Sequence, residues 1–229
     1  MRHFENINSK NEQVVMLALN TLANKDSSIE AYRSAFQSLG IELGRLIGEH
    51  VSSISPDEVM MVCASEDADW LAKGVQYGLG KGKTPISVYW NSRSQAYADE
   101  HEKLEISPIV KAYEEPISKC RLLVVVKSII SSSCVVKTQL TRLVGKINPE
   151  QIAIAAPVMY KDGIPNLRKE FPETIAQKFD FFTFAVDDER SENNEVIPGI
   201  GGMVYTRLGL GDMDSKNSYM PQIVLDRLQ

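Results

Sequence analysis

The sequence has few of the features that mark specialised classes of protein. It contains only three cysteines among 229 residues and no Cys-x-x-Cys pair, which argues against a disulfide framework or a zinc site. Its net charge is −5 and its pI about 5.4, so it lacks the basic surplus of a dedicated nucleic-acid-binding protein. No apolar run approaches the roughly 18–20 residues that cross a bilayer, and the N-terminus lacks the apolar stretch of a signal peptide. We therefore expect a cytoplasmic protein without nucleic-acid or membrane partners.

The composition is that of an ordinary globular protein. Hydrophobic residues make up 43% and charged residues 24% of the chain, which suits one domain with a sizeable core. Apolar residues at helical spacing predict helices at 11–24 and 27–50, which together form a helical N-terminal extension over residues 1–52. Gly40 and Gly44 lie in the apolar stripe of the second helix, so we expect either a break or close packing there.

Beyond these helices, short apolar segments alternate with helical patterns. Such alternation predicts an α/β fold with a mainly parallel sheet flanked by helices. Residues 91–119 are polar and charged, and we expect either a helix with a loop or a mobile flap. The expected strands are 58–64, 86–90, 121–127, 151–156 and 181–186, and the expected helices are 67–79, 135–144 and part of 167–178.

Ligands of such sheets bind beyond the carboxyl ends of the strands. The loops at 64–69, 128–134 and 187–202 each follow an expected strand. Because parallel strands point the same way, these three loops should open on one edge of the sheet. A shared ligand site is expected at that edge.

The most informative local feature is the strand RLLVVVK followed by a turn of small residues, Ser131, Ser132, Ser133 and Cys134. The start of a helix offers backbone N–H groups to an anion, and serine hydroxyls add further donors. This turn either binds a phosphate group or is a serine-rich helix cap without a ligand. Lys127 either contacts that phosphate or lies at the edge of the loop.

Two longer segments carry a resemblance to a known family. IAIAAPVMYKDGIPNLRKEFP occupies residues 152–172, and FFTFAVDDERSENNEVIPGIGGMVYTRLG occupies residues 181–209. With the strand, turn and helix at 122–136, they resemble the uracil phosphoribosyltransferases, and the likeness extends over residues 55–212. The order of the family's motifs is kept by Ala155, Ala156, Pro157, Gly163, Leu167, Pro172, Ala185, Asp187, Ile197, Pro198, Gly199, Ile200, Gly201, Arg207, Leu208 and Gly209.

The resemblance implies a type I phosphoribosyltransferase-like fold and a division of the site into three parts. Residues 91–119 would form a hood over the site, and the chain would assemble at least into a homodimer. The residues that bind the 5′-phosphate would be Lys127, Ser131, Ser132, Ser133 and Cys134. The diphosphate loop would consist of Ala64, Ser65, Glu66 and Asp67. The base would be bound by Ile197, Gly199 and Gly201.

The chain departs from the family where that chemistry is carried out. Val126 replaces the acidic residue of the phosphate loop, and Ala64 replaces the arginine of the diphosphate loop. Glu66 and Asp67 make the diphosphate loop acidic, so it repels a diphosphate unless a metal ion bridges the two. Gly202 stands where the family has an aspartate. The resemblance therefore implies a degenerate diphosphate and magnesium site.

Two functions are compatible with these residues. The first is a phosphoribosyltransferase-like protein that binds a nucleotide, nucleobase or ribose phosphate without standard phosphoribosyl transfer. The alternative is an active uracil phosphoribosyltransferase, or a related glycosyl-transfer enzyme, that moves ribose 5-phosphate to a pyrimidine. Mg²⁺ is expected only in the second case, because it stabilises a departing diphosphate. The sequence assigns no catalytic residue and no protein ligands for a metal.

Two groups of acidic residues, each at the end of an expected strand, can be interpreted in two ways. Glu66, Asp67 and Asp69 bind either a metal or ribose hydroxyls, or they form a solvated loop end. Asp187 and the two acidic residues after it are placed well for catalysis, but they also suit a turn with exposed carboxylates.

Overall fold

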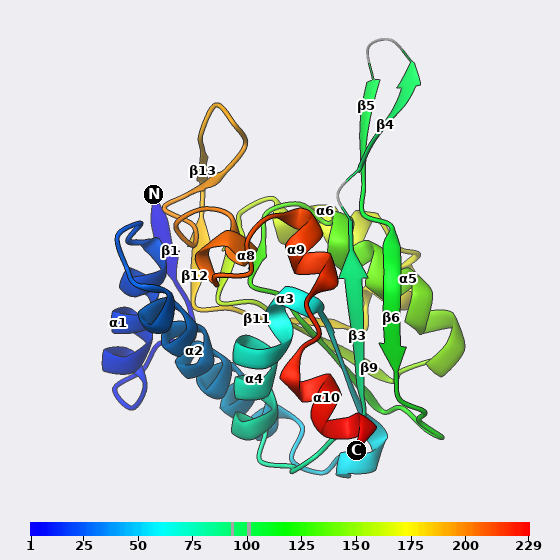
Figure 1. Cartoon of the computed structure of the whole chain (residues 1–229). Helices are drawn as coiled ribbons and strands as arrows, with labels where there is room; N and C mark the ends of the chain where they lie inside the picture. Colours follow the sequence, from blue (N-terminus) through cyan, green and yellow to red (C-terminus); the bar gives the residue numbers. More distant parts are fainter. Residues whose placement is uncertain (93, 100–101) are drawn as a thin grey trace.

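The computed structural model describes residues 1–92, 94–99 and 102–229. Helices cover both faces of a central sheet, and the N-terminal strand joins a second, smaller sheet (Figure 1). Within the described residues, no helix has the length and apolar character needed to cross a bilayer. The structure thus has the mainly parallel sheet flanked by helices that the sequence predicts.

The central sheet has six strands in the order β11-β9-β7-β2-β3-β6. All neighbouring strands are parallel except β3 and β6, which run antiparallel. Every residue of β2 and β7 is buried, as expected for uninterrupted apolar strands covered on both faces. The strands are β2 (Val59–Ala64), β3 (Ile86–Asn91), β6 (Ile109–Glu114), β7 (Leu122–Val126), β9 (Gln151–Ala155) and β11 (Phe179–Phe182).

The smaller sheet has the strand order β1-β12-β10-β8. β1 runs antiparallel to β12, and the other neighbours are parallel. The strand expected at 181–186 is in fact divided between β11 of the central sheet and β12 of this one, because the chain changes sheet at Thr183. The four strands are β1 (Arg2–Phe4), β8 (Ile129–Ile130), β10 (Val158–Tyr160) and β12 (Ala185–Asp187).

The long helices follow the apolar periodicity of the sequence. Ser28 begins the second helix, and its hydroxyl oxygen accepts a hydrogen bond from Ala31 N at 3.2 Å. The helical elements before residue 80 are α1 (Glu12–Ala23), α2 (Ile29–His50), η1 (Pro56–Glu58), α3 (Ser65–Asp67), the π-helical turn η2 (Ala68–Ala72) and α4 (Lys73–Gly78). Those after residue 130 are α5 (Cys134–Ile147), α6 (Gly163–Lys169), α7 (Glu173–Ala176), α8 (Val204–Arg207), α9 (Met213–Ser218) and α10 (Gln222–Leu228).

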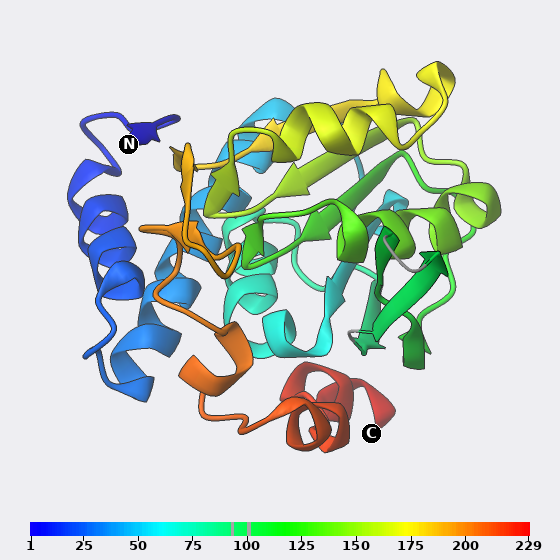
Figure 2. The same cartoon turned by 90° about the horizontal axis from the view of Figure 1, so that it is seen from above.

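The two faces of the central sheet bury separate hydrophobic cores. Along β2, Val59, Met61 and Cys63 contact the core shared with α1, α2 and α4. The alternate residues Met60 and Val62 contact the core shared with α5 and α6. This alternation is the two-residue period of a strand. Figure 2 shows the strands running between these helical layers, with α1 and α2 at the N-terminal side of the molecule.

Close packing, rather than a break, explains the glycines of α2. A Cβ atom at Gly40 would lie 2.4 Å from Leu71 O, and one at Gly44 would lie 2.2 Å from Val75 O. Only glycine permits so close an approach of two helix backbones. α2 therefore remains unbroken and lies directly against η2 and α4.

The segment 91–119 forms strands rather than the helix offered as one alternative. β4 (Ser94–Asp99) and β5 (Glu102–Ile106) pair antiparallel and stand out from the body of the protein, and β6 returns along the edge of the central sheet (Figure 1). β6 is an edge strand, and most of its residues are exposed to solvent. The expectation of a hood also covers residues 93 and 100–101, which lie outside the described residues. Whether the hairpin moves stays a prediction.

Candidate functional site

A cavity of about 570 Å³ opens where β2, β3 and β7 end. Its floor includes Glu66 after β2, Asn91 at the end of β3 and Lys127 after β7. Its walls come from the 128–136 turn, which runs into α5, and from the segment 190–205. The loops after three parallel strands thus meet at one edge of the sheet, as the sequence predicts.

The small-residue turn forms one wall of this cavity. Ser131, Ser132 and Cys134 line it, together with Lys127 at its floor. Ser133 instead directs its hydroxyl to Glu170 Oε1, at 3.4 Å. The first turn of α5 contains no acidic residue, so no carboxylate of that turn offsets the positive end of the helix dipole. The wall therefore offers hydroxyls and the start of a fourteen-residue helix to an anion.

Two carboxylates and two ammonium groups form a buried cluster at the floor of the cavity. Lys127 Nζ lies 2.7 Å from Asp67 Oδ2 and 3.5 Å from Glu66 Oε1. Lys216, which comes from α9, places its Nζ 3.7 Å from Glu66 Oε2. All four side chains are more than nine-tenths buried. Because the charges pair two against two, the cluster is neutral overall.

Sheet register explains why Asp67 and Lys127 meet. Cys63 in β2 lies opposite Val126 in β7, so the residues that follow each strand emerge side by side. Asp67 Oδ1 also accepts a hydrogen bond from Ser128 N at 3.1 Å, which fixes the loop after β7. The diphosphate-loop residues divide accordingly: Glu66 lines the cavity, Asp67 anchors the neighbouring loop, and Ala64 and Ser65 are fully buried beneath them.

The cluster shifts the pKa values of its members. Burial by itself raises the pKa of Glu66, but the ammonium groups of Lys127 and Lys216 outweigh it and hold that pKa below the ordinary value. Burial raises the pKa of Asp67 in spite of the Lys127 ammonium group beside it. Burial lowers the pKa of Lys216, and the charge of Lys127 acts in the same direction. Glu66 is therefore ionised at neutral pH.

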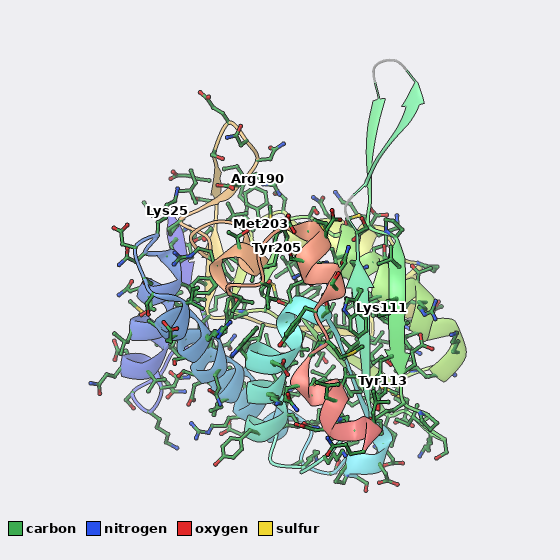
Figure 3. The ribbon with its side chains drawn as sticks, in the orientation of Figure 1. Lys25, Lys111, Tyr113, Arg190, Met203 and Tyr205 are labelled. Atoms are coloured by element: carbon green, nitrogen blue, oxygen red, sulfur yellow. The ribbon has the colours of Figure 1, made fainter. Side chains whose placement is uncertain are left out.

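Arg190 closes the cavity from the opposite side. It lies in the hairpin of β13 (Glu189–Arg190) and β14 (Val196–Ile197), and its guanidinium stacks over the Tyr160 ring at 4.0 Å. One of its terminal nitrogens donates to Ser131 O, so it reaches the wall formed by the small-residue turn directly. Figure 3 shows Arg190 together with Met203 and Tyr205, and all three line the cavity. Arg190 Nε is buried without a hydrogen-bond partner among the described residues.

The glycine-rich segment lies at the cavity but presents other residues than expected. Among the described residues, Ile200 and Gly202 line the cavity, whereas Ile197, Gly199 and Gly201 do not. The backbone of Gly199 is occupied within the protein, because its N–H donates to Asp187 Oδ2 at 2.9 Å and its carbonyl accepts from Arg2 Nη2 at 2.8 Å.

Packing explains the next glycine of the segment. A Cβ atom at Gly201 would lie 2.3 Å from Leu22 O, so this glycine allows the segment to pack on α1. Binding of a base by Ile197, Gly199 and Gly201 stays a prediction. Ile200 and Gly202, which are close to them in sequence, line the cavity instead.

Two acidic residues considered for chemistry hold the fold together instead. Asp187 is fully buried, where it pairs with Arg2. Asp69 accepts hydrogen bonds from Ile223 N at 2.8 Å and Gln222 N at 2.7 Å, and also from the Tyr219 hydroxyl. Asp69 thus attaches the C-terminal segment to the helix after β2. Neither carboxylate lines the cavity among the described residues.

Lys216 and Arg190 are functional candidates that the sequence did not reveal. Lys216 lies in the polar run DSKNS, and Arg190 follows an acidic turn, so neither sits in a pattern that marks a site. Both reach the cavity through contacts that join parts of the chain more than fifty residues apart. The C-terminal sequence is rich in glycine and only weakly periodic, so it did not predict the helices that position Lys216.

Magnesium does not fit the residues of the floor. Glu66 and Asp67 are its carboxylates, and both lie within 4 Å of a lysine ammonium group, which repels a divalent cation. Within the described residues there is no group of three or more His, Cys, Asp or Glu side chains that could hold a metal ion. No step is assigned to Mg²⁺ here.

Comparison with known proteins gives a likeness in fold. No protein-family model matches the chain, and no curated protein matches its sequence. The AQ2163 protein from Aquifex aeolicus has a TM-score of 0.67 at 15% identity, and the match covers 86% of this chain and 94% of that one. This likeness shows a shared fold and nothing about activity.

Two further solved structures are similar over smaller parts. A hypothetical protein from Neisseria gonorrhoeae with bound ppGpp has a TM-score of 0.42 at 13% identity, over 68% of this chain and 80% of that one. A purine phosphoribosyltransferase from Pyrococcus horikoshii has a TM-score of 0.38 at 15% identity, over 56% and 74% of the two chains. At these scores neither supports a conclusion about the site of this chain, which is similar in overall fold to the AQ2163 protein.

Proposed function

We propose that this chain is a phosphoribosyltransferase-like protein that binds a nucleotide, nucleobase or ribose phosphate without standard phosphoribosyl transfer. The observation that carries the proposal is the cavity itself. It brings the turn at the start of α5, the guanidinium of Arg190 and a floor of paired charges around one space of about 570 Å³. That volume suits a small polar ligand.

One end of the cavity is suited to a single phosphate group. The hydroxyls of Ser131 and Ser132, the N-terminus of α5 and the Arg190 guanidinium supply donors from two sides. Arginine adds a planar, permanently charged donor beside a turn of uncharged serines. This arrangement provides the charge that the turn by itself does not carry.

The other end is suited to a neutral, hydroxyl-rich group. Glu66 Oε2 is buried and accepts no hydrogen bond from the described residues, although the Lys216 ammonium lies 3.7 Å away. Ser107 Oγ, which also borders the cavity, is likewise buried without a partner in the described part of the chain. Buried polar atoms of this kind gain from a ligand's hydroxyls. A ribose ring supplies them.

The same floor disfavours transfer from a diphosphate. A departing diphosphate needs cationic or metal stabilisation. In the loop after β2, Glu66 and Asp67 place carboxylates there, and Lys127 and Lys216 are engaged in neutralising them. Binding of a phosphorylated sugar or nucleotide is therefore favoured over the alternative of an active pyrimidine phosphoribosyltransferase.

Thermal-shift measurements test this proposal. Ribose 5-phosphate and nucleoside monophosphates with each base are expected to raise the melting temperature, and uracil by itself to raise it less. A Ser132→Glu variant places a carboxylate in the phosphate wall and should abolish the shift. Thr141→Glu adds the same charge on α5, the helix that follows the turn, away from this cavity, and should keep the shift.

A direct assay separates the two functions. The protein is incubated with phosphoribosyl diphosphate, Mg²⁺ and uracil, and nucleotide is sought by chromatography. We expect none. Nucleotide formed at an enzymatic rate would overturn the binding proposal and show that the protein is a transferase. If no ligand raises the melting temperature, both functions are contradicted.

A homodimer is part of the proposal. α1 exposes apolar side chains, with Leu17 69% and Val14 43% exposed, and such residues suit a symmetric contact. Gel filtration is expected to show a particle of at least twice the 25.5 kDa chain. A single monomer peak would contradict it.

A further inference from the structure

Lys216 is a buried lysine at the cavity and pairs with Glu66. Its side chain is 2% exposed, yet it borders the cavity. Nζ donates to Asn91 O at 2.5 Å, and it lies 3.7 Å from Glu66 Oε2. That distance is too long for a direct hydrogen bond but is spanned by one water molecule or one substrate oxygen. The amine and a carboxylate oxygen thus face each other across a gap.

A second ammonium group lies in the same cluster. Lys127 Nζ is held by Asp67 Oδ2 at 2.7 Å and by Ser128 Oγ at 2.9 Å, and it is 3.5 Å from Glu66 Oε1. Burial and the nearby Lys127 charge lower the pKa of Lys216. A desolvated lysine beside another cation is the form of lysine that attacks carbonyl carbon. Glu66 is the group that can exchange a proton with it.

Proton exchange between Lys216 and Glu66 leaves the net charge of the cluster unchanged. When Glu66 takes a proton from Lys216, both become neutral, while Asp67 and Lys127 keep their ion pair. The cluster therefore stays neutral before and after the transfer. A buried site in which the net charge does not change avoids the large cost of creating an unpaired charge in a poorly solvated interior.

We propose that Lys216 forms an imine with the open-chain aldehyde of an aldose phosphate whose phosphate group lies against Ser131, Ser132 and Arg190. The inference rests on the phosphate subsite of the proposed function and adds a covalent step to it. The ligand class follows from the residues that line the cavity: Ser131, Ser132 and Arg190 offer donors to a phosphate, and Lys216 offers an amine to a carbonyl carbon.

The step balances without any further reagent. Glu66 takes a proton from the Lys216 ammonium, and the neutral amine attacks the aldehyde carbon. The C–N bond forms, the carbonyl π bond breaks, and its oxygen takes the proton from Glu66. Glu66 then removes a proton from nitrogen and passes it to the new hydroxyl, which leaves as water as the C=N bond forms. Ammonium and aldehyde become protonated imine and water, and nothing is oxidised or reduced.

Reductive trapping tests the inference. The full chain is incubated with erythrose 4-phosphate, whose phosphorylated terminal oxygen prevents ring closure, in the presence of sodium cyanoborohydride. Peptide mass spectrometry should find one dominant secondary-amine adduct, on the peptide that contains Lys216. Excess inorganic phosphate should slow the labelling at least tenfold, because it competes for the phosphate subsite.

Matched variants sharpen the result. Lys216→Arg keeps the positive charge and should lose the adduct, whereas Lys146→Arg, at an exposed lysine on α5, should keep it. Glu66→Gln should slow labelling at least tenfold and flatten its dependence on pH, which a purely structural role would not do. If Lys216→Arg does not fold, the site of labelling in the wild-type protein decides by itself.

The outcomes distinguish this inference from the binding proposal. Labelling spread over the exposed lysines, or no labelling at all, overturns the imine. If ribose 5-phosphate still raises the melting temperature in that case, the binding proposal stands. If neither ribose 5-phosphate nor any other ligand of the thermal-shift series raises it, both are overturned.

Discussion

Arg2 and Asp187 form a two-point ion pair in which Nε lies 2.7 Å from Oδ1 and Nη2 lies 2.7 Å from Oδ2. Asp187 is fully buried, and both partners also hydrogen-bond to the backbone of Gly199. The first strand of the chain is thereby joined to the segment that leads into the wall of the cavity. This pair is a structural anchor for the site.

Removing the arginine should destabilise the protein strongly. Arg2→Ala leaves the Asp187 carboxylate buried without its partner, and breaking a buried pair in this way costs about 3–5 kcal/mol. Urea denaturation measures the change. Arg121→Ala is the control, because its ion pair with Glu150 is half-exposed and should cost no more than about 1 kcal/mol. Equal losses in the two variants would show that Arg2 does not hold Asp187.

The glycines of α2 predict a second contrast. Gly44→Ala puts a Cβ atom 2.2 Å from Val75 O, so the helices must separate, at a cost of about 1–3 kcal/mol or more. Gly145→Ala, in α5, has no atom within 4 Å of the new Cβ and should stabilise the helix by up to about 1 kcal/mol. Melting temperatures compare the two. A stable Gly44→Ala protein would contradict the close contact of α2 with α4.

The pKa of Glu66 predicts a change of stability with pH. Burial raises this pKa, but the charges of Lys127 and Lys216 outweigh it, so the folded value lies below the ordinary 4.5. The stabilisation from the ionised carboxylate is fully present above pH 4.5 and is lost as pH falls through the lower, folded pKa.

Glu66→Gln should therefore show a smaller loss of stability between pH 4.5 and more acidic solution than the wild-type protein shows. The free energy of unfolding, measured by urea denaturation at a series of pH values, gives the comparison. Glu30→Gln, at an exposed position in the first turn of α2, should leave the profile unchanged. Parallel profiles for wild type and Glu66→Gln would rule out a lowered pKa in the folded protein.

Arg190 should control phosphate affinity. Arg190→Ala removes one charged donor from the cavity, and the loss of a hydrogen bond to a charged group is worth about 1.5–3 kcal/mol, or roughly a tenfold to hundredfold weaker binding. Calorimetric titration with ribose 5-phosphate measures it. Arg142→Ala, on the outer side of α5, removes an equal charge and should leave affinity unchanged. Equal affinity in all three proteins would place the phosphate elsewhere.

Much of the fold could be predicted because its signals are local. The apolar periods of α1, α2 and β7 are continuous in sequence, and parallel strands require that the loops after them share an edge. For the same reason the turn at Ser131 could be placed near the end of β7. The hydrophobic pattern thus predicted the sheet with its flanking helices, and the edge of the sheet at which the cavity opens.

The finer features of the site depend on long-range contacts that leave no local pattern. β4, β5 and β6 were missed because strands in a hairpin and at a sheet edge can be polar. Gly199 suggested a ligand contact, but its backbone groups bond to Arg2 and Asp187. Lys216 is a single residue in a short helix. Its position at the cavity can be seen only in the folded structure, where its Nζ donates a hydrogen bond to Asn91 O at the end of β3.

The C-terminal segment is attached to Asp69, and this attachment carries Lys216 over the floor of the cavity. The ribosome therefore synthesises every strand of the central sheet before it adds Lys216. A chain that stops at residue 212 contains the residues of every strand of the central sheet and the turn at Ser131, but it lacks the Lys216 ammonium that lies beside Glu66. If ligand binding depends on Lys216, only chains that extend through residue 216 bind the ligand.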